Sequence, residues 1–204
     1  TVGAAAMSFT AASYAKVIGA NDRIRLGLIG CGGRGYQAHM GGIHPHDKAQ
    51  NVEFVAVSDP WKVRRERAAA RVKEWYNRTA AQFVSYRDVL AMKDVDAVMI
   101  ASLDHHHCMH LEAAAKVKKD AYCEKPLAMT MESLNRTVDA VKAAGIVVQM
   151  GTQVRSYPTS AGCKALFESG AIGKVSRIEQ CRNGGKPYWY SWMQRAGEIK
   201  AEDV

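Results

Sequence analysis

A short apolar run, RIRLGLIG, begins at Arg23 and leads directly into the glycine-rich sequence GCGGRG. The run is typical of a buried strand, and the G-x-G-x-x-G spacing is typical of a turn from a strand into a helix. In such a turn Gly30 allows a tight bend, Gly32 lets the backbone approach a phosphate, and Gly35 lets the helix pack closely on the sheet. A purely structural turn is the alternative. The residues of the predicted phosphate-binding loop are Gly30, Gly32, Gly33, Arg34 and Gly35.

Strand-like apolar runs alternate with helix-like stretches along the next part of the chain. This rhythm is typical of parallel strands joined by helical crossovers, so we predict an α/β fold with a doubly wound (Rossmann) sheet of six strands. Gly145 is a suitable residue to end the last of the helices. The predicted strands after the loop are 52–58, 83–84, 96–102, 121–123 and 146–150, and the predicted helices are 61–76, 105–118 and 130–144.

The rhythm changes after residue 150. A helix is predicted over 158–170, and residues 175–182 alternate like a strand with one solvated face. We therefore divide the chain into a leader or arm (1–22), a dinucleotide-binding domain (23–150), and the incomplete beginning of an α+β substrate or oligomerisation domain (151–204).

Composition and charge limit the kinds of binding partner, metal site and location that we expect. The net charge is +8, but the basic residues are dispersed, and the densest run lies on what would be one solvated helix face, so we expect no nucleic-acid binding. Five scattered cysteines without a CxxC pair argue against a disulfide framework or a structural zinc site. Residues 1–20 are too short and too polar to span a membrane, and they resemble the tail of an export signal. A periplasmic or exported location is therefore predicted, with a cytoplasmic one as the alternative.

Asp59 closes the second predicted strand, where an acidic residue binds the adenine ribose in dinucleotide-binding domains. A carboxylate there accepts hydrogen bonds from ribose hydroxyls and repels a 2′-phosphate, which favours NAD over NADP. Lys62, Arg64 and Arg65 follow directly and could neutralise a phosphate, which keeps NADP open. The structural alternative is that Asp59 and Pro60 only cap the next helix.

A histidine-rich segment follows the fourth predicted strand. Asp104 is a candidate helix N-cap that also points into the ligand crevice, and Ser102 and His107 are expected to line the cofactor site with it. His106 and His110 are one helical turn apart, which suggests a metal. Successive histidines point in different directions, however, and no further ligand has zinc spacing, so no metal site is predicted.

Glu124-Lys125-Pro126 closes the fifth predicted strand. A lysine at this position can orient a substrate hydroxyl or assist removal of its proton. Pro126 fixes the backbone there, and a cis bond before it is consistent with such a turn. An ordinary turn is the alternative.

Together these motifs resemble the glucose–fructose oxidoreductase / inositol dehydrogenase / MocA family across residues 23–185. The matching sequences are GLIGCGGRG, SDP, DHHH, EKP and MGTQVRSYP, in the family's order. The resemblance implies an NAD(P)-dependent oxidoreductase that transfers a hydride between a secondary hydroxyl of a sugar or cyclitol and nicotinamide. It places Lys125 in the catalytic centre and Glu124 beside it, Gln153 and Arg155 near the domain junction, and suggests a homo-oligomer.

In that family the second domain usually supplies a histidine as acid/base partner, and no histidine follows His110 here. We therefore expect that partner to lie beyond residue 204 or on another chain. Two alternatives stay open: an NAD-dependent glycosidase that oxidises its substrate transiently, and a non-catalytic nucleotide-binding or subunit-association module. Release of an aglycone without net NADH would identify the glycosidase, and failure of any complementing segment to restore turnover would identify the module.

Overall fold

One parallel sheet organises the computed structural model, which describes residues 23–179 of the chain. In this part the strands lie in the order β3-β2-β1-β4-β5-β6, and every neighbouring pair is parallel. The order turns back between β1 and β4, which confirms the predicted doubly wound fold. The strands are β1 (Ile24–Ile29), β2 (Val52–Ser58), β3 (Ala81–Phe83), β4 (Ala97–Ile100), β5 (Asp120–Glu124) and β6 (Val148–Gly151).

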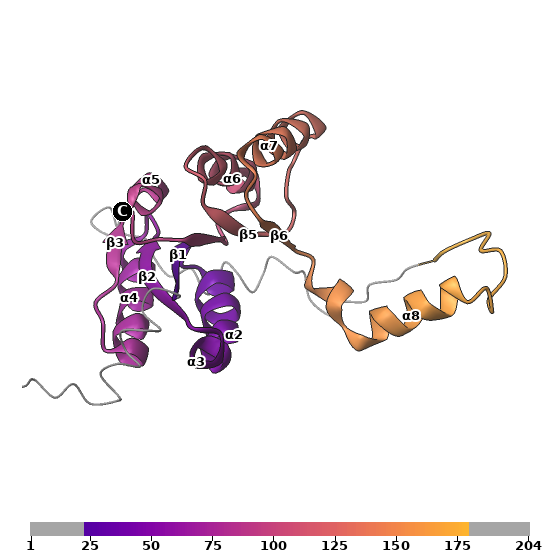
Figure 1. Ribbon diagram of the computed structural model, residues 1–204, viewed down its shortest axis with the longest axis horizontal. Helices are drawn as coiled ribbons and strands as arrows, with labels where there is room; N and C mark the ends of the chain where they lie inside the picture. The colour runs from indigo at the N-terminus through magenta and orange to yellow at the C-terminus, as the bar shows by residue number, and fades with distance from the viewer. Residues whose placement is uncertain (1–22, 180–204) are drawn as a thin grey trace, which may run out of the picture.

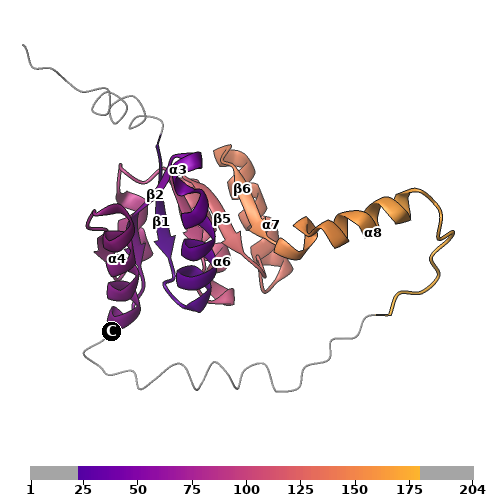
Figure 2. The same ribbon diagram turned by 90° about the horizontal axis from the view of Figure 1, so that it is seen from below.

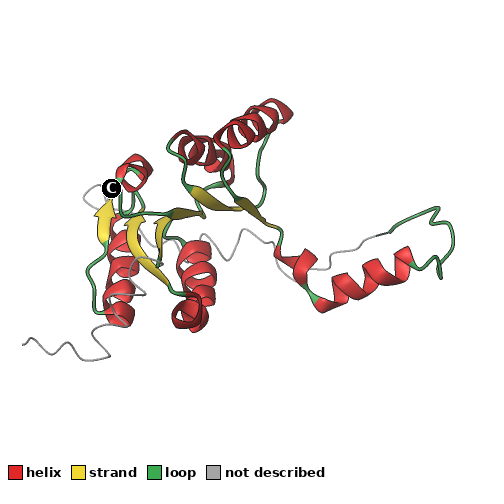
Figure 3. Cartoon of the chain, in the orientation of Figure 1, coloured by secondary structure: helices red, strands yellow, loops and turns green. Residues whose placement is uncertain are grey.

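Helices lie on both faces of the sheet (Figures 1 and 3). One face carries η1 (Arg34–Met40), α2 (Gly41–Ile43), η2 (His44–His46), α3 (Asp47–Gln50) and α4 (Lys62–Tyr76). The other face carries α5 (Tyr86–Ala91), η3 (Asp104–His106), α6 (His107–Lys116) and α7 (Met131–Ala144). This two-sided cover explains why the central strands are apolar at successive positions rather than at alternate ones.

Two apolar cores result, one on each face. Leu28 and Ile29 are neighbours in β1 with opposite orientations, and both are buried. Leu28 belongs to a cluster with Phe54 and Val72, whereas Ile29 belongs to one with Ile100 and Leu111. Full burial of one such side chain contributes about 1.5–3 kcal/mol to folding stability. The two clusters therefore hold the strand ends, and the turns after them, in place.

Several helix boundaries follow from local chemistry. Thr130 precedes α7 and accepts a hydrogen bond from the Ser133 amide at 3.2 Å. Gly145 ends the same helix with a φ of 69°, which confirms its predicted role. Ser85 starts α5 in the same way as Thr130 starts α7. The sequence analysis missed α5 because six residues are too few to show helical periodicity.

Three local predictions within residues 23–150 were wrong. The third strand is Ala81–Phe83 rather than 83–84, because these three residues pair in parallel with the end of β2. Asp104 is not an N-cap: a short 3₁₀ turn starts there and α6 begins only at His107, with no side-chain cap on either. The glycine loop leads not into one regular helix but into a π-helical turn followed by shorter pieces up to Gln50.

After β6 the chain forms η4 (Gln153–Ser156) and α8 (Pro158–Glu168), and α8 lies away from the sheet (Figures 1 and 2). The helix predicted over 158–170 is confirmed. Residues 175–179 are not a strand, because none of the described residues pairs with them, and 180–182 lie outside the described part. The predicted leader (1–22) also lies outside it, so export and the domain boundaries stay predictions. No helix in the described part is long and apolar enough to cross a membrane.

Candidate cofactor and active site

The predicted site residues meet at one edge of the sheet. Because all the strands are parallel, the turns after β1, β2, β4, β5 and β6 emerge at the same carboxyl edge. The glycine loop follows β1, and Ser102 follows β4. These two strands are neighbours, and the strand order turns back between them. Doubly wound sheets bind their ligands in the crevice outside this point. The sequence-predicted residues therefore converge where the fold provides a ligand crevice.

Close backbone packing requires two of the loop glycines. Gly30 has a φ of 94°, and a Cβ there would lie 2.6 Å from the Ala101 carbonyl oxygen. A Cβ on Gly35 would collide with the carbonyl oxygen of Gly30 itself. Gly33, in contrast, has open space within 4 Å of where a Cβ would lie, and it precedes η1 without a side-chain cap. The loop thus leaves uncapped backbone N–H groups at a helical start, which suits a pyrophosphate.

Asp59 lies where the sequence placed it, but its carboxylate faces inward. Oδ2 accepts a hydrogen bond from the Cys31 amide at 2.8 Å, and Oδ1 accepts one from the Trp61 amide at 2.9 Å. The residue is buried. Asp59 therefore ties the glycine loop to the turn before α4. It does not cap that helix, whose N-cap position is Trp61.

Glu124 is the centre of a buried polar cluster. Its Oε1 lies 2.8 Å from Arg34 Nε and 3.1 Å from His39 Nε2, and its Oε2 accepts the Lys125 amide at 3.2 Å. The Tyr122 hydroxyl also donates to Oε1, at 3.4 Å. A carboxylate buried with a guanidinium partner is far more favourable than an isolated one. Glu124 thus joins the turn after β5 to the loop after β1.

Gln153 extends this cluster to the turn after β6. With its amide oriented to satisfy both ends, Gln153 accepts a hydrogen bond from Arg34 and donates one to the Gly151 carbonyl at 2.5 Å. Arg34 is therefore held by residues of two other strand ends. Its guanidinium faces Glu124 and Gln153. The cofactor contact predicted for Arg34 from its motif position stays a prediction.

His39 and Tyr122 are members of this cluster that the sequence analysis missed. Their rings meet edge to face with centroids 4.8 Å apart. Burial lowers the pKa of His39 below its ordinary value, although Glu124 opposes this, and burial raises the pKa of Tyr122. Neither residue belongs to a recognisable motif. Only the fold brings η1 and β5 together, so no sequence signal could have found them.

Lys125 differs from its neighbour Glu124 in the exposure and in the contacts of its side chain. Its side chain is exposed, and none of the described residues forms a hydrogen bond or ion pair with its ammonium group. The turn that carries it contains a cis Lys125–Pro126 bond. It is held by His107, whose Nδ1 lies 2.6 Å from the Pro126 carbonyl oxygen. An unpaired ammonium on a fixed backbone is suited to meet a ligand group.

The histidines after β4 support this turn. His107 is almost fully buried, and its Nε2 lies 3.2 Å from the Ser102 carbonyl oxygen, so both ring nitrogens face backbone carbonyls. The Ser102 hydroxyl pairs with His110 Nδ1 at 3.0 Å. Burial, with His106, His107 and Arg87 nearby, lowers the pKa of His110 to about 4. Asp104 is exposed on the adjacent 3₁₀ turn.

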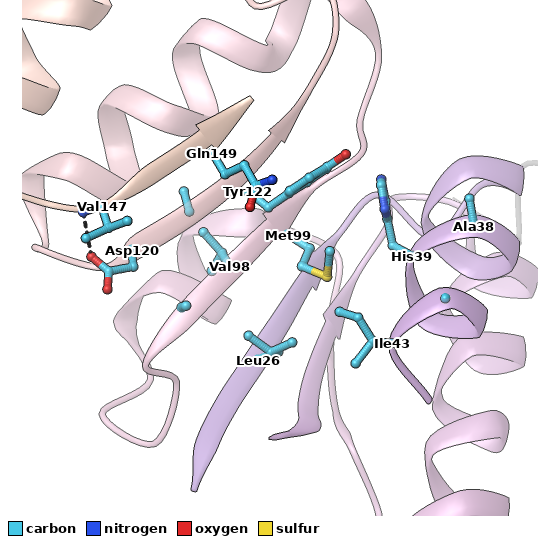
Figure 4. Close-up of a pocket in the computed structure, with 13 residues that line it drawn as sticks. Leu26, Ala38, His39, Ile43, Val98, Met99, Asp120, Tyr122, Val147 and Gln149 are labelled. Atoms are coloured by element: carbon cyan, nitrogen blue, oxygen red, sulfur yellow. Dashed lines mark hydrogen bonds between the residues drawn. The ribbon is translucent and has the colours of Figure 1, made fainter. Parts of the chain in front are cut away.

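No group of three or more potential metal ligands occurs among the described residues. A separate apolar depression lies on the sheet face between η1–α2 and strands β4 to β6 (Figure 4). Leu26, Ile43 and Met99 line it, together with His39 and Tyr122. The chemistry of the strand-end turns is thus distinct from this apolar surface, and the two share only the aromatic members of the Glu124 cluster.

The fold and the site define a dinucleotide-binding domain of an oxidoreductase, and comparison with known proteins supports the same class. Residues 24–152 match the model of a family described as an oxidoreductase family with an NAD-binding Rossmann fold. The chain belongs to this family, the glucose–fructose oxidoreductase / inositol dehydrogenase / MocA family. The predictions of the family, the fold and an NAD-binding domain are confirmed.

Curated relatives are about twice as long as the matched region. The chain is 31% identical over 181 residues to an uncharacterized oxidoreductase, YrbE, of Bacillus subtilis (strain 168), covering 87% of this chain and 49% of YrbE. It is 36% identical over 156 residues to an inositol 2-dehydrogenase of Acidothermus cellulolyticus, covering 76% and 43%. The chain therefore spans about half the length of the curated relatives it matches.

Among solved structures, the WlbA dehydrogenase of Bordetella pertussis, crystallised with NADH and UDP-GlcNAcA, is similar with a TM-score of 0.67. Sequence identity is 29%, and the match covers 75% of this chain and 45% of WlbA. A levoglucosan dehydrogenase in complex with NADH and levoglucosan matches with a TM-score of 0.64 and 28% identity, over 75% of this chain and 41% of that one.

Proposed function

We propose that this chain is the cofactor-binding half of an NAD-dependent dehydrogenase that transfers a hydride between a secondary alcohol carbon of a sugar or cyclitol and the nicotinamide ring. The observation that carries the proposal is the pairing of a buried anchor, Glu124, with an unpaired ammonium, Lys125, on the same turn. The inositol and levoglucosan dehydrogenases among the relatives support the substrate class.

The loop glycines and the start of η1 would hold the pyrophosphate of the cofactor, since they combine open space at Gly33 with a helical start that no side chain caps. When bound, the nicotinamide supplies the hydride acceptor. Ser102 and Asp104 follow β4 and would lie along the cofactor, while Glu124 and Gln153 would act through Arg34 by fixing the loop.

Lys125 would donate a hydrogen bond to the substrate hydroxyl oxygen and stabilise the negative charge that develops there as the proton leaves. His107 would position Lys125 by holding the Pro126 carbonyl. We propose that a second group accepts the proton, because an ammonium has donors only. A histidine contributed from outside residues 23–179 fits that role.

The test is NADH formation, followed by absorbance, in the longest natural form of the protein with a panel of inositols and simple sugars. Lys125→Ala is expected to lower kcat by about 100-fold or more, with NADH affinity changed little, because a positioned acid/base group contributes on that scale. Unchanged kcat in the variant would contradict the role of Lys125. Aglycone release from glycosides without net NADH would instead establish the glycosidase reaction.

A further inference from the structure

Helix α8 carries an exposed apolar surface. Ser160, Lys164 and Glu168 recur at every fourth position and form one polar stripe, in which the Lys164 ammonium pairs with the Glu168 carboxylate. The remaining residues are mostly apolar or small, and the two largest, Leu166 and Phe167, are 52% and 58% exposed. An amphipathic helix normally packs its apolar side against a neighbouring surface. Within residues 23–179 the apolar side of α8 has no such cover.

The second uncovered surface is the apolar depression on the sheet (Figure 4). It has a volume of about 500 Å³, and Val147, one of its lining residues, is 71% exposed. Helices α6 and α7 lie on the opposite side of β4 to β6, whereas no helix of the described part covers this side of β5 and β6 (Figure 1). Parallel sheets are normally covered by helices on both faces. The depression therefore lacks the helix that would complete the layer.

The helix and the depression match in size and in chemistry. α8 has 11 residues and is about 16 Å long, whereas β4 to β6 span two strand spacings, or about 10 Å. Leu26, Ile43 and Met99 make the depression apolar, and the Asp120 carboxylate beside them already accepts the Val147 amide at 2.8 Å. The polar stripe of α8 can stay in water while its apolar side is covered. Docking therefore buries apolar area on both sides without burying an unpaired charge.

The joint before α8 directs the helix away from the depression of its own chain. The Thr152 amide donates to the Met150 carbonyl at 2.8 Å, which fixes the turn between β6 and η4. The Ser160 hydroxyl donates to the Val154 carbonyl at 2.7 Å, which joins η4 to the first turn of α8. With this joint in place α8 points away from the sheet (Figures 1 and 2). Folding back would disturb these hydrogen bonds, whereas a second copy can receive the helix without that change.

We propose that two copies of this chain associate by exchanging α8, so that each copy seats the apolar side of its helix in the depression of the other. Because one chain carries both the helix and the surface that fits it, the exchange is reciprocal and gives a closed two-fold interface. Once one contact has formed, the second forms within the same pair of chains and strengthens it. The proposal goes beyond the proposed function and does not depend on the reaction or on the cofactor.

Sedimentation equilibrium of the 204-residue chain tests the exchange, with Gly41→Arg and Gly42→Arg as a matched pair. The two glycines are neighbours in α2, and a Cβ on either one would meet no atom within 4 Å, so both variants should fold. Of the two, only Gly42 lines the depression. The wild type is expected to be a dimer with a Kd of about 10 μM or below. Gly42→Arg should raise this Kd by about 100-fold, because it places a charge under the docked helix. Gly41→Arg should change it by less than about two-fold.

A second pair of variants tests the helix itself. Leu166→Asp places a carboxylate on the apolar side of α8 and should raise the dimer Kd by about 100-fold. Lys164→Ala removes a charge from the polar stripe of the same helix and should change the dimer Kd by less than about two-fold. Equal effects of the two changes would contradict docking through the apolar side.

Cross-linking identifies the chain that supplies the helix. Gln149 is exposed and lines the depression, and Cys163 is an exposed cysteine of α8. With Cys181 changed to serine, Gln149→Cys should give covalent dimers with a short bis-maleimide. Glu132→Cys, exposed on α7 at the opposite side of the sheet, is the control and should give only background.

Several results would overturn the proposal. One is a wild-type chain that stays monomeric at about 100 μM. Another is an equal effect of Gly41→Arg and Gly42→Arg on the dimer. An intrachain link between positions 149 and 163 would show that the depression receives α8 of its own chain. Equal cross-linking of the two cysteine variants would show unspecific contact. Failure of the chain to bind a nucleotide would refute the proposed function and would leave these results unaffected.

Discussion

The two ends of the candidate site are built in different ways. At the glycine loop, backbone meets backbone: Gly30 and Gly35 are required because no Cβ fits beside the Ala101 and Gly30 carbonyls. At the turn after β5, side chains from distant segments meet around Glu124, and the adjacent Lys125 remains unpaired. The first end is determined by close contacts that only glycine permits, and the second by buried polar partners. Substitutions should therefore disturb them by different mechanisms.

The largest effect on stability is expected at the glycine loop. Gly35→Ala would force a Cβ into the Gly30 carbonyl, which belongs to the main chain and cannot rotate away, so unfolding free energy should fall by about 3 kcal/mol. Urea denaturation measures the loss. Gly33→Ala is the control: its site is open and its φ is −53°, so stability should change by less than about 0.5 kcal/mol. Equal losses in the two variants would contradict the packing argument.

Stability should also depend on pH through His110, which contacts Ser102 in the turn after β4. The pKa of His110, about 4, lies below its ordinary value because the ring is buried near His106, His107 and Arg87. The folded chain therefore binds fewer protons than the unfolded chain as pH falls from about 6.5 to 4, and stability should decrease across that window by up to about 3 kcal/mol. Above pH 6.5 this contribution is constant.

Denaturation midpoints measured at a series of pH values test this prediction. His110→Asn retains a polar group beside the Ser102 hydroxyl and removes the titration, so its stability should depend less on pH in that window. The buried His39 has a pKa lowered in the same direction and should leave a residual slope. An unchanged slope in the variant would place the pH dependence elsewhere.

Breaking the Glu124 cluster should have an intermediate effect. Glu124→Gln removes the charge that faces Arg34 and His39, and stability should fall by about 2 kcal/mol, less than for a fully buried pair because Arg34 is partly exposed. Asp94→Asn, which removes an exposed partner of Arg25, should cost under about 0.5 kcal/mol. Nucleotide affinity should fall only in Glu124→Gln, because only that cluster fixes the loop. Equal losses of stability and of nucleotide affinity in the two variants would contradict this role of Glu124.

The smallest effect on stability is expected at Lys125. Lys125→Ala should change unfolding free energy by less than about 0.5 kcal/mol, because its side chain is exposed and has no partner among the described residues. Lys119→Ala should cost about 1 kcal/mol, since the Lys119 ammonium donates to the Met92 and Val95 carbonyls. A larger loss in Lys125→Ala would mean that this lysine is structural rather than available to a ligand.

The same difference explains what the sequence could reveal. The roles of the glycine loop and of the buried strands could be predicted, because tight turns and buried parallel strands produce short-range patterns in the sequence. Gly30 and Gly35 are the examples in the loop. The inward-facing Asp59 carboxylate, the engaged Arg34, and the contributions of His39 and Tyr122 depend on contacts between residues far apart in the chain. No local pattern encodes such contacts. The motifs therefore predicted residues that the fold brings together at one edge of the sheet, but they did not reveal which side chains face the interior.

The central claim is that the glycine loop holds the pyrophosphate of a nicotinamide dinucleotide, and NADH titration of the full chain with Gly32→Val tests it most directly. The wild type should bind NADH saturably at one site per chain. Gly32→Val should weaken binding by about 100-fold while urea denaturation stays near wild type, because its side chain would occupy the space of the phosphate beside Arg64. Wild-type affinity in that variant, or no saturable binding by the folded chain, would contradict the claim.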